Sequence, residues 1–81
     1  LTKTVALEVA EHGVTVNCIS PGGFERGQPK KFISAYNQTV PMQRMGIDGK
    51  EMKGAVVFLA SEASSYVTGH NLVVDGGLSA W

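Results

Sequence analysis

Apolar residues recur with helical spacing over the first twelve positions. Leu1, Val5 and Val9 lie four residues apart, with alanines beside them, which is typical of the buried face of a helix. His12 followed by Gly13 is a common helix end, because glycine readily adopts the left-handed conformation. The pattern predicts a helix over this segment that packs closely against another element.

A short run of β-branched and apolar residues, VTVNCI, follows at 14–19 and predicts a strand, since it is too short for a helix. Pro21 and the two glycines after it predict an abrupt end to this strand. Asn17 is an amide in a mostly apolar run. Because a buried amide needs hydrogen-bond partners, we expect it to tie the strand to a neighbouring loop rather than to contact a ligand.

The segment 20–47 is longer than an ordinary connection, and long ordered loops are usually functional. A short helix is predicted within it at 30–38. Regular spacing returns at 48–60, where one face of a helix is predicted. That face consists of Met52, Ala55, Val56 and Leu59. Asp48 and Glu51 have the spacing of a capping box, and a final strand is predicted at 71–74.

The order of strand, helix and strand predicts a right-handed crossover with parallel strands. Parallel sheets are normally covered on both faces, and two strands with two or three helices cannot cover themselves. A lone core in 81 residues would also be marginal. We therefore expect neighbours supplied by an N-terminal part or by another chain.

Charge and composition exclude several classes of partner. The 7 basic and 7 acidic residues cancel, so no basic surface for nucleic acid or membrane lipid is predicted. No apolar run reaches the length of a membrane span. Two separate histidines and Cys18 do not make a metal site, and a single cysteine fits the cytoplasm.

Four segments in register resemble the short-chain dehydrogenase/reductase family. They are TVALEVAEHGV at 4–14, VTVNCISPGG at 14–23, PMQRMG at 41–46 and VVFLASEASSYVTGHNLVVDGG at 56–77. The family shows a strand ending in N-x-x-x-P-G, a substrate loop, L-A-S followed by T-G, and V-D-G-G in the same order. The resemblance covers nearly all of the chain. Within the family, the sugar-acid and polyol branch, with gluconate 5-dehydrogenase-like proteins, is most similar. The ketoacyl reductase branch shares most of these features and stays open.

This resemblance implies an α/β fold, the C-terminal part of a doubly wound parallel-sheet nucleotide-binding (Rossmann) fold. Residues 1–81 would supply two adjacent strands, their crossover helix and a substrate loop to one domain. Ligands bind such folds outside the carboxyl ends of the strands. The cofactor would be NAD or NADP, lying along the residues after the first strand, namely Pro21, Gly22, Gly23 and Phe24. Without the flanking segments, the tripeptide Pro21-Gly22-Gly23 would be interpreted as an ordinary turn at the end of a strand.

The family's catalytic motif Y-x-x-x-K does not occur in the chain. Tyr36 is followed four residues later by Val40, and Tyr66 by His70. We therefore expect no catalytic residue in this chain; the motif, the catalytic serine and the glycine-rich pyrophosphate loop should lie upstream of Leu1. The expected function is part of an NAD(P)-dependent oxidoreductase that transfers a hydride to or from a hydroxyl or carbonyl of a small polar substrate. The chain alone should be inactive.

Candidates for substrate contact are Phe24, Glu25, Arg26 and Tyr36. Arginine matches carboxylate geometry, whereas a solvated surface charge is the simpler reading of Arg26, and the aromatic residues serve equally well as packing. Arg44 is expected to brace the start of the helix at 48–60. As partners we expect a second copy of the chain, in a dimer or homotetramer, through helix 48–60 and strand 71–74. The alternatives are a non-enzymatic subunit-interaction module and, more remotely, a phosphate-binding domain built on the turn at 21–23.

Overall fold

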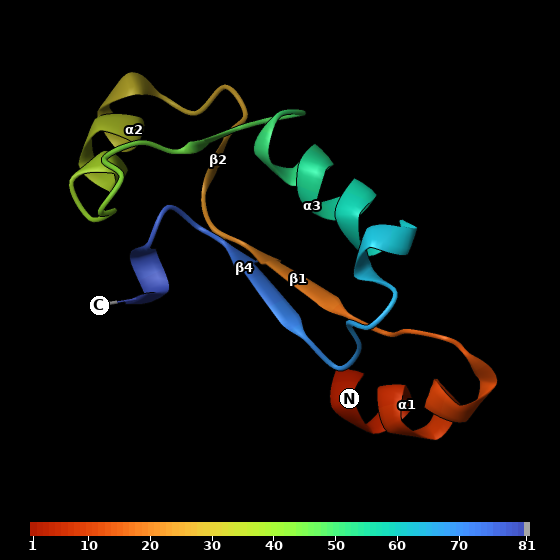
Figure 1. The fold of residues 1–81 in the computed structure, drawn as a ribbon. Coiled ribbons are helices and arrows are strands. Elements are labelled where there is room, and N and C mark those ends of the chain that lie inside the picture. The colour runs from red at the N-terminus through yellow and green to blue at the C-terminus, as the bar shows by residue number, and fades with distance from the viewer. Residues whose placement is uncertain (81) are drawn as a thin grey trace.

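The computed structural model describes residues 1–80. Two parallel strands lie at its centre, α3 lies beside them, and α1 and α2 lie near opposite ends (Figure 1). The helices are α1 (Thr2–Val9), α2 (Lys30–Asn37) and α3 (Glu51–Leu59), with short 3-10 turns η1 (Ala10–His12), η2 (Glu62–Ser64) and η3 (Leu78–Ala80). The strands are β1 (Cys18–Pro21), β2 (Phe24–Glu25), β3 (Gly46–Ile47) and β4 (Asn71–Val74).

The central pair joins β1 and β4 in parallel, from Cys18 opposite Asn71 to Pro21 opposite Val74. This is the parallel arrangement that the strand–helix–strand order predicts, and β4 occupies the predicted range. β1 begins four residues later than the predicted strand at 14–19 and includes Pro21. That expectation was wrong at both ends.

The displacement of β1 has a physical reason. Val16 and Asn17 bond to the turn before β4 instead of to a strand, through Thr68, Gly69 and His70. At the other end, the N–H groups of Cys18 and Gly22 donate toward the β4 side. Because strand N–H groups alternate in direction, the nitrogen of Pro21 faces the open edge, where proline removes no ladder bond.

Asn17 makes the ties expected of it. Its Nδ2 donates to the Val67 carbonyl at 3.0 Å, and its Oδ1 accepts from the His70 N–H at 3.0 Å. The helix predicted over 1–12 is α1 continued by η1. It ends at Gly13, whose φ of 74° is left-handed. Two expected features are therefore present: the helix end at Gly13 and the attachment of Asn17 to the segment before β4.

The loop 20–47 contains elements that periodicity did not predict. β2 and β3 pair in parallel, with Phe24 opposite Gly46. The loop is also joined to the end of β4, because the Met42 N–H donates to the Gly76 carbonyl at 3.1 Å. It thus leaves the sheet after β1 and returns to the same end, carrying α2 at its far side (Figure 1).

The helix predicted over 48–60 is shorter, and its predicted cap was wrong. α3 begins at Glu51, and Lys50, which occupies the N-cap position, makes no capping hydrogen bond through its side chain. Asp48 instead lies 3.5 Å from Arg26. The Glu51 carboxylate accepts from the Ile47 N–H at 3.0 Å, so the carboxylate satisfies the turn before the helix rather than the helix itself.

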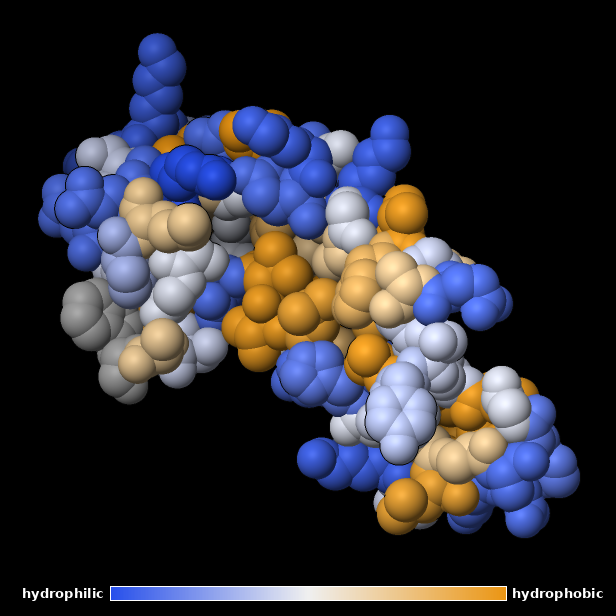
Figure 2. Space-filling model, viewed as in Figure 1, coloured by the Kyte–Doolittle hydropathy of each residue, from blue (hydrophilic) through white to orange (hydrophobic). Residues whose placement is uncertain are grey.

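The described residues enclose little core. Only Ala6, Val40, Met45 and Ser64 are buried. The radius of gyration is 15.4 Å, against about 12 Å for a compact domain of this length. Apolar side chains gather at the surface over β4 and beside α3 (Figure 2), where Val57 is 59% and Val73 is 44% exposed. These faces require another surface to cover them, as expected for part of a larger assembly or domain.

Candidate functional site

The carboxyl ends of β1 and β4 meet at one edge of the sheet. The Gly22 N–H donates to the Val74 carbonyl at 2.9 Å. A Cβ at Gly22 would lie 2.7 Å from the Cβ and 2.9 Å from the Cα of Asp75. Glycine is therefore required here by the close approach of the two strands.

Asp75 organises the turn after β4. Its two carboxylate oxygens accept from the N–H groups of Gly77 at 2.9 Å and Ser79 at 3.0 Å. The Ser79 side chain, together with these backbone donors, outweighs the desolvation of the carboxyl and lowers the pKa of Asp75. Gly76 and Gly77 have φ of 65° and 96°, so this turn needs residues without a Cβ.

A cavity of about 450 Å³ opens beside the end of β1. It is lined by Pro21, Gly22, Phe24, Arg26, Asp48 and Met52. Its volume lies within the range of small-molecule sites. Three of the four residues predicted to contact the cofactor therefore share one cavity; Gly23 is not among its lining residues.

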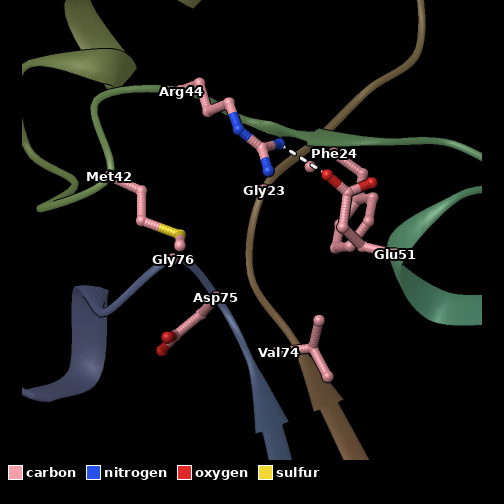
Figure 3. Close-up of a pocket in the computed structure, with 9 residues that line it drawn as sticks. Gly23, Phe24, Met42, Arg44, Glu51, Val74, Asp75 and Gly76 are labelled. Atoms are coloured by element: carbon pink, nitrogen blue, oxygen red, sulfur yellow. Dashed lines mark hydrogen bonds and ion pairs between the residues drawn. The ribbon is translucent and has the colours of Figure 1, made fainter. Parts of the chain in front are cut away.

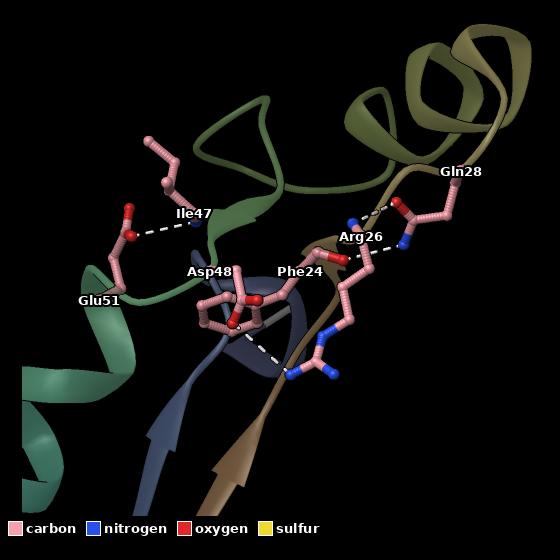
Figure 4. Close-up of polar contacts among 6 residues, drawn as sticks. All are labelled: Phe24, Arg26, Gln28, Ile47, Asp48 and Glu51. Atoms are coloured by element: carbon pink, nitrogen blue, oxygen red, sulfur yellow. Dashed lines mark hydrogen bonds and ion pairs between the residues drawn. The ribbon is translucent and has the colours of Figure 1, made fainter.

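Arg26 and Asp48 stand at this cavity as an exposed pair, with 3.5 Å between Nη2 and Oδ1. Gln28 fixes the backbone beneath them. Its Nε2 donates to the Phe24 carbonyl at 2.8 Å and its Oε1 accepts from the Arg26 N–H at 2.7 Å (Figure 4). The main chain at Arg26 is thus held, while its guanidinium has one weak partner, Asp48, within residues 1–80.

Gly23 turns away from that cavity and is engaged by the loop. Its N–H donates to the Tyr36 hydroxyl at 2.7 Å, and its carbonyl accepts from the Gly46 N–H at 2.9 Å. The Tyr36 ring covers the missing side chain, since a Cβ at Gly23 would lie 2.5 Å from Cζ. Both backbone groups of Gly23 are occupied by the protein.

A second, smaller cavity of about 40 Å³ lies between the loop and the sheet. Phe24, Met42, Arg44 and Glu51 line it, with the start of the turn after β4 (Figure 3). Arg44 Nη1 lies 2.6 Å from Glu51 Oε1, which is the bracing expected of Arg44. Desolvation opposes ionisation of Glu51, but the hydrogen bonds from Arg44 and the Ile47 N–H outweigh it and lower the pKa of Glu51. This cavity is too small for a ligand and belongs to the framework.

The other two residues predicted to contact the substrate, Glu25 and Tyr36, do not line the β1 cavity. Glu25 lines another opening, of about 490 Å³, with Gln28, Lys30 and Ile33, on the α2 side of the loop. Tyr36 is joined to Gly23 rather than to Arg26. The sequence did not indicate that Asp48 and Met52 line the β1 cavity, because both residues fitted the pattern of the helix predicted at 48–60.

Some kinds of site are absent from the described part of the chain. Among residues 1–80, no three histidine, cysteine or acidic side chains are grouped to hold a metal ion. Within the same residues, no helix is both long and apolar enough to cross a membrane.

Comparisons with known proteins agree with this geometry. The model of a family described as enoyl-(acyl carrier protein) reductase matches residues 1–79. A solved short-chain dehydrogenase from Leptospira borgpetersenii with bound NAD+ superposes with a TM-score of 0.89 at 46% identity, covering 96% of this chain and 30% of that one. The chain belongs to the short-chain dehydrogenase/reductase family. Its two parallel strands and crossover helix match the C-terminal part of the family's Rossmann fold.

Two curated short-chain dehydrogenase/reductase relatives come from different branches. A D-arabinitol 2-dehydrogenase (ribulose-forming) of Scheffersomyces stipitis is 43% identical over all of this chain and 32% of its own length. A 3-oxoacyl-(acyl-carrier-protein) reductase of Buchnera aphidicola is 45% identical over 94% of this chain and 32% of its own. This member of the family therefore spans about a third of the relatives it matches.

Proposed function

We propose that this chain forms the cofactor- and substrate-facing C-terminal part of an NAD(P)-dependent oxidoreductase. The enzyme would transfer a hydride between nicotinamide and a hydroxyl or carbonyl of a small polar substrate. The observation that carries the proposal is the cavity beside Pro21, Gly22 and Phe24, at the carboxyl end of β1. Ligands of doubly wound folds bind at this end of the strands. The solved relative from Leptospira borgpetersenii holds NAD+, and another, YwfH, is described as NADPH dependent.

The residues of the β1 cavity fit the nicotinamide half of such a cofactor. Pro21 has no N–H and Gly22 no side chain, so a flat ring meets few protruding groups there. Phe24 adds an apolar wall, and Arg26 and Asp48 are the charged groups of the lining. The cofactor would donate or accept the hydride, and these residues would orient its ring and exclude water. The proton chemistry needs a general acid that this sequence does not contain.

Two features support a sugar-acid or polyol substrate. The arabinitol dehydrogenase aligns over the whole chain. Arg26 offers an exposed guanidinium, paired only with Asp48 among the described residues, and a substrate carboxylate fits it in bidentate fashion. A 3-oxoacyl substrate is the second candidate, favoured by the ketoacyl reductase relative. Glu25, beside α2, and Tyr36, on α2, are proposed to face the more distant part of the substrate.

We further propose that the protein acts in the cytoplasm as a dimer or tetramer, assembled through α3 and β4. The exposed apolar side chains on these two elements support self-association, because two-fold contacts are the commonest way to cover such faces.

The test uses this sequence within a complete dehydrogenase domain that supplies Y-x-x-x-K. NAD+ and NADP+ are each offered with D-arabinitol, with gluconate and with a 3-hydroxyacyl thioester, and nicotinamide reduction is followed by absorbance. We expect turnover with a polyol or sugar acid, and none from the isolated 81-residue chain. Turnover by the purified isolated chain would contradict our placement of the catalytic residues. Turnover with the thioester alone would favour the second candidate.

A further inference from the structure

Helix α2 is attached to the rest of the described chain by very little. It has no buried side chain. Its one side-chain hydrogen bond to a segment distant in sequence, among the described residues, runs from the Gly23 N–H to the Tyr36 hydroxyl at 2.7 Å. The other hydrogen bonds at its ends are local, such as that from Ile33 N–H to the Pro29 carbonyl. The hydrogen bond between Tyr36 and Gly23 is therefore the tether that attaches this helix to the turn after β1.

The tether ends in the turn proposed to hold the cofactor. Gly23 lies between Gly22 and Phe24, which line the β1 cavity. The Tyr36 ring fills the space above Gly23, and Phe32 stacks on that ring, with 6.5 Å between ring centroids. Gly23 and α2 are thus joined by a hydrogen bond and a packed ring, so a shift of the turn would also displace the helix.

We propose that Tyr36 is a positioning residue through which cofactor binding at 21–24 orders helix α2 on the substrate side of the loop. This inference rests on the proposed function. Because such coupling is reciprocal, an ordered α2 also holds Gly23 in the conformation that the cofactor requires. Tyr36 acts through Gly23 and takes no part in proton transfer.

The test compares three proteins, each within a complete dehydrogenase domain: wild type, Tyr36→Phe and, as the matched control, Tyr66→Phe. Tyr66 is fully exposed, so its variant loses the same hydroxyl without losing a contact among the described residues. Binding of NADH and of NADPH is measured by fluorescence titration. Hydrogen exchange of the peptides covering 20–28 and 30–37 is followed with and without cofactor, and the melting temperature is recorded.

Tyr36→Phe keeps the ring and removes only the hydrogen bond. We expect it to weaken cofactor binding roughly three- to tenfold, the range for one lost hydrogen bond. Cofactor should protect 30–37 from exchange in wild type and Tyr66→Phe but not in Tyr36→Phe. Gly23→Ala provides an independent break, because Gly23 is not at positive φ yet a Cβ there meets the Tyr36 ring. Combining it with Tyr36→Phe should add little further loss.

Several results would overturn the inference. If Tyr36→Phe binds cofactor as wild type does and cofactor still protects α2, the tether does not couple the two. A lower melting temperature with unchanged binding and protection would make Tyr36 a purely structural residue. If wild type binds neither NADH nor NADPH, the proposed function itself fails, which is a different outcome from a wild type that binds and a variant that matches it.

Discussion

Arg44, near the end of the loop, pairs with Glu51 in the first turn of α3, with 2.6 Å between Nη1 and Oε1. The other oxygen of Glu51 accepts from the Ile47 N–H. A single carboxylate thus fixes the direction in which the chain leaves β3 and enters the helix. Both partners need the carboxylate charged, since a protonated acid is a weaker acceptor for a guanidinium.

The first prediction is that this junction weakens in acid. The pKa of Glu51 is lowered from 4.5 by folding, so its contribution to stability is complete above that pH and is lost as the pH falls below it. Glu51→Gln should lower the melting temperature at neutral pH, and its difference from wild type should shrink on acidification.

Melting temperatures of the complete domain from about pH 6 to about pH 3 measure this effect. Glu8→Gln, on an exposed position of α1 without a carboxylate contact in the described chain, serves as the control. Asp75 also has a lowered pKa, so wild type keeps some acid sensitivity in either case. A constant difference between Glu51→Gln and wild type across this range would contradict the assignment.

A second prediction compares Gly22, where a side chain would clash with Asp75, and Gly54, where a side chain would meet open space. Gly22→Val should destabilise the domain by about 1–3 kcal/mol, as overpacking does, because its Cβ would meet the backbone of Asp75 at 2.9 Å. Gly54 lies within α3 with open space around it. Gly54→Ala should therefore stabilise the domain by roughly 0.5–1 kcal/mol.

Urea unfolding of both variants compares these effects directly. If Gly22→Val unfolds at the wild-type urea concentration while cofactor binding is lost, the glycine serves ligand access alone. A destabilised Gly22→Val confirms that it serves the junction of β1 with β4.

The third prediction addresses assembly. Val57 is 59% exposed on α3, and Val57→Glu places charges opposite each other across a two-fold contact. We expect the dimer or tetramer dissociation constant to rise at least about tenfold. Val57→Leu keeps an apolar side chain and should assemble as wild type. Sedimentation of both variants decides this, and equal assembly of Val57→Glu would move the interface elsewhere.

Much of the framework followed from local signals. The left-handed Gly13 and the strand at 71–74 were readable from sequence, as was the amide of Asn17 that joins β1 to the turn before β4. The start of β1 was not readable, because the residues at 14–17 carry the same β-branched pattern whether or not a partner strand lies beside them. Their partner in this structure is a turn, and no periodicity specifies that.

The site was less predictable than the framework. The turn at Pro21 could be located from its position after a strand, but the roles of its glycines could not. The Asp75 backbone that excludes a side chain at Gly22 is more than fifty residues away in sequence. The pairing of Asp48 with Arg26 competed with a helix cap that fitted Asp48 equally well, and only the folded distance of 3.5 Å decides between them.

The loop between β1 and α3 leaves and rejoins the sheet at one end, held by the contacts of Gly23 with Gly46 and of Met42 with Gly76. The entropy of closing such an excursion grows only with the logarithm of its length. Residues added or removed near α2 should therefore cost the fold little, provided that the two attachment points are kept. This tolerance agrees with the similarity of the chain to both a polyol dehydrogenase and a ketoacyl reductase. For engineering, we would exchange residues of segment 26–40 to seek a new specificity while keeping Tyr36, because its hydrogen bond with Gly23 joins α2 to the turn after β1.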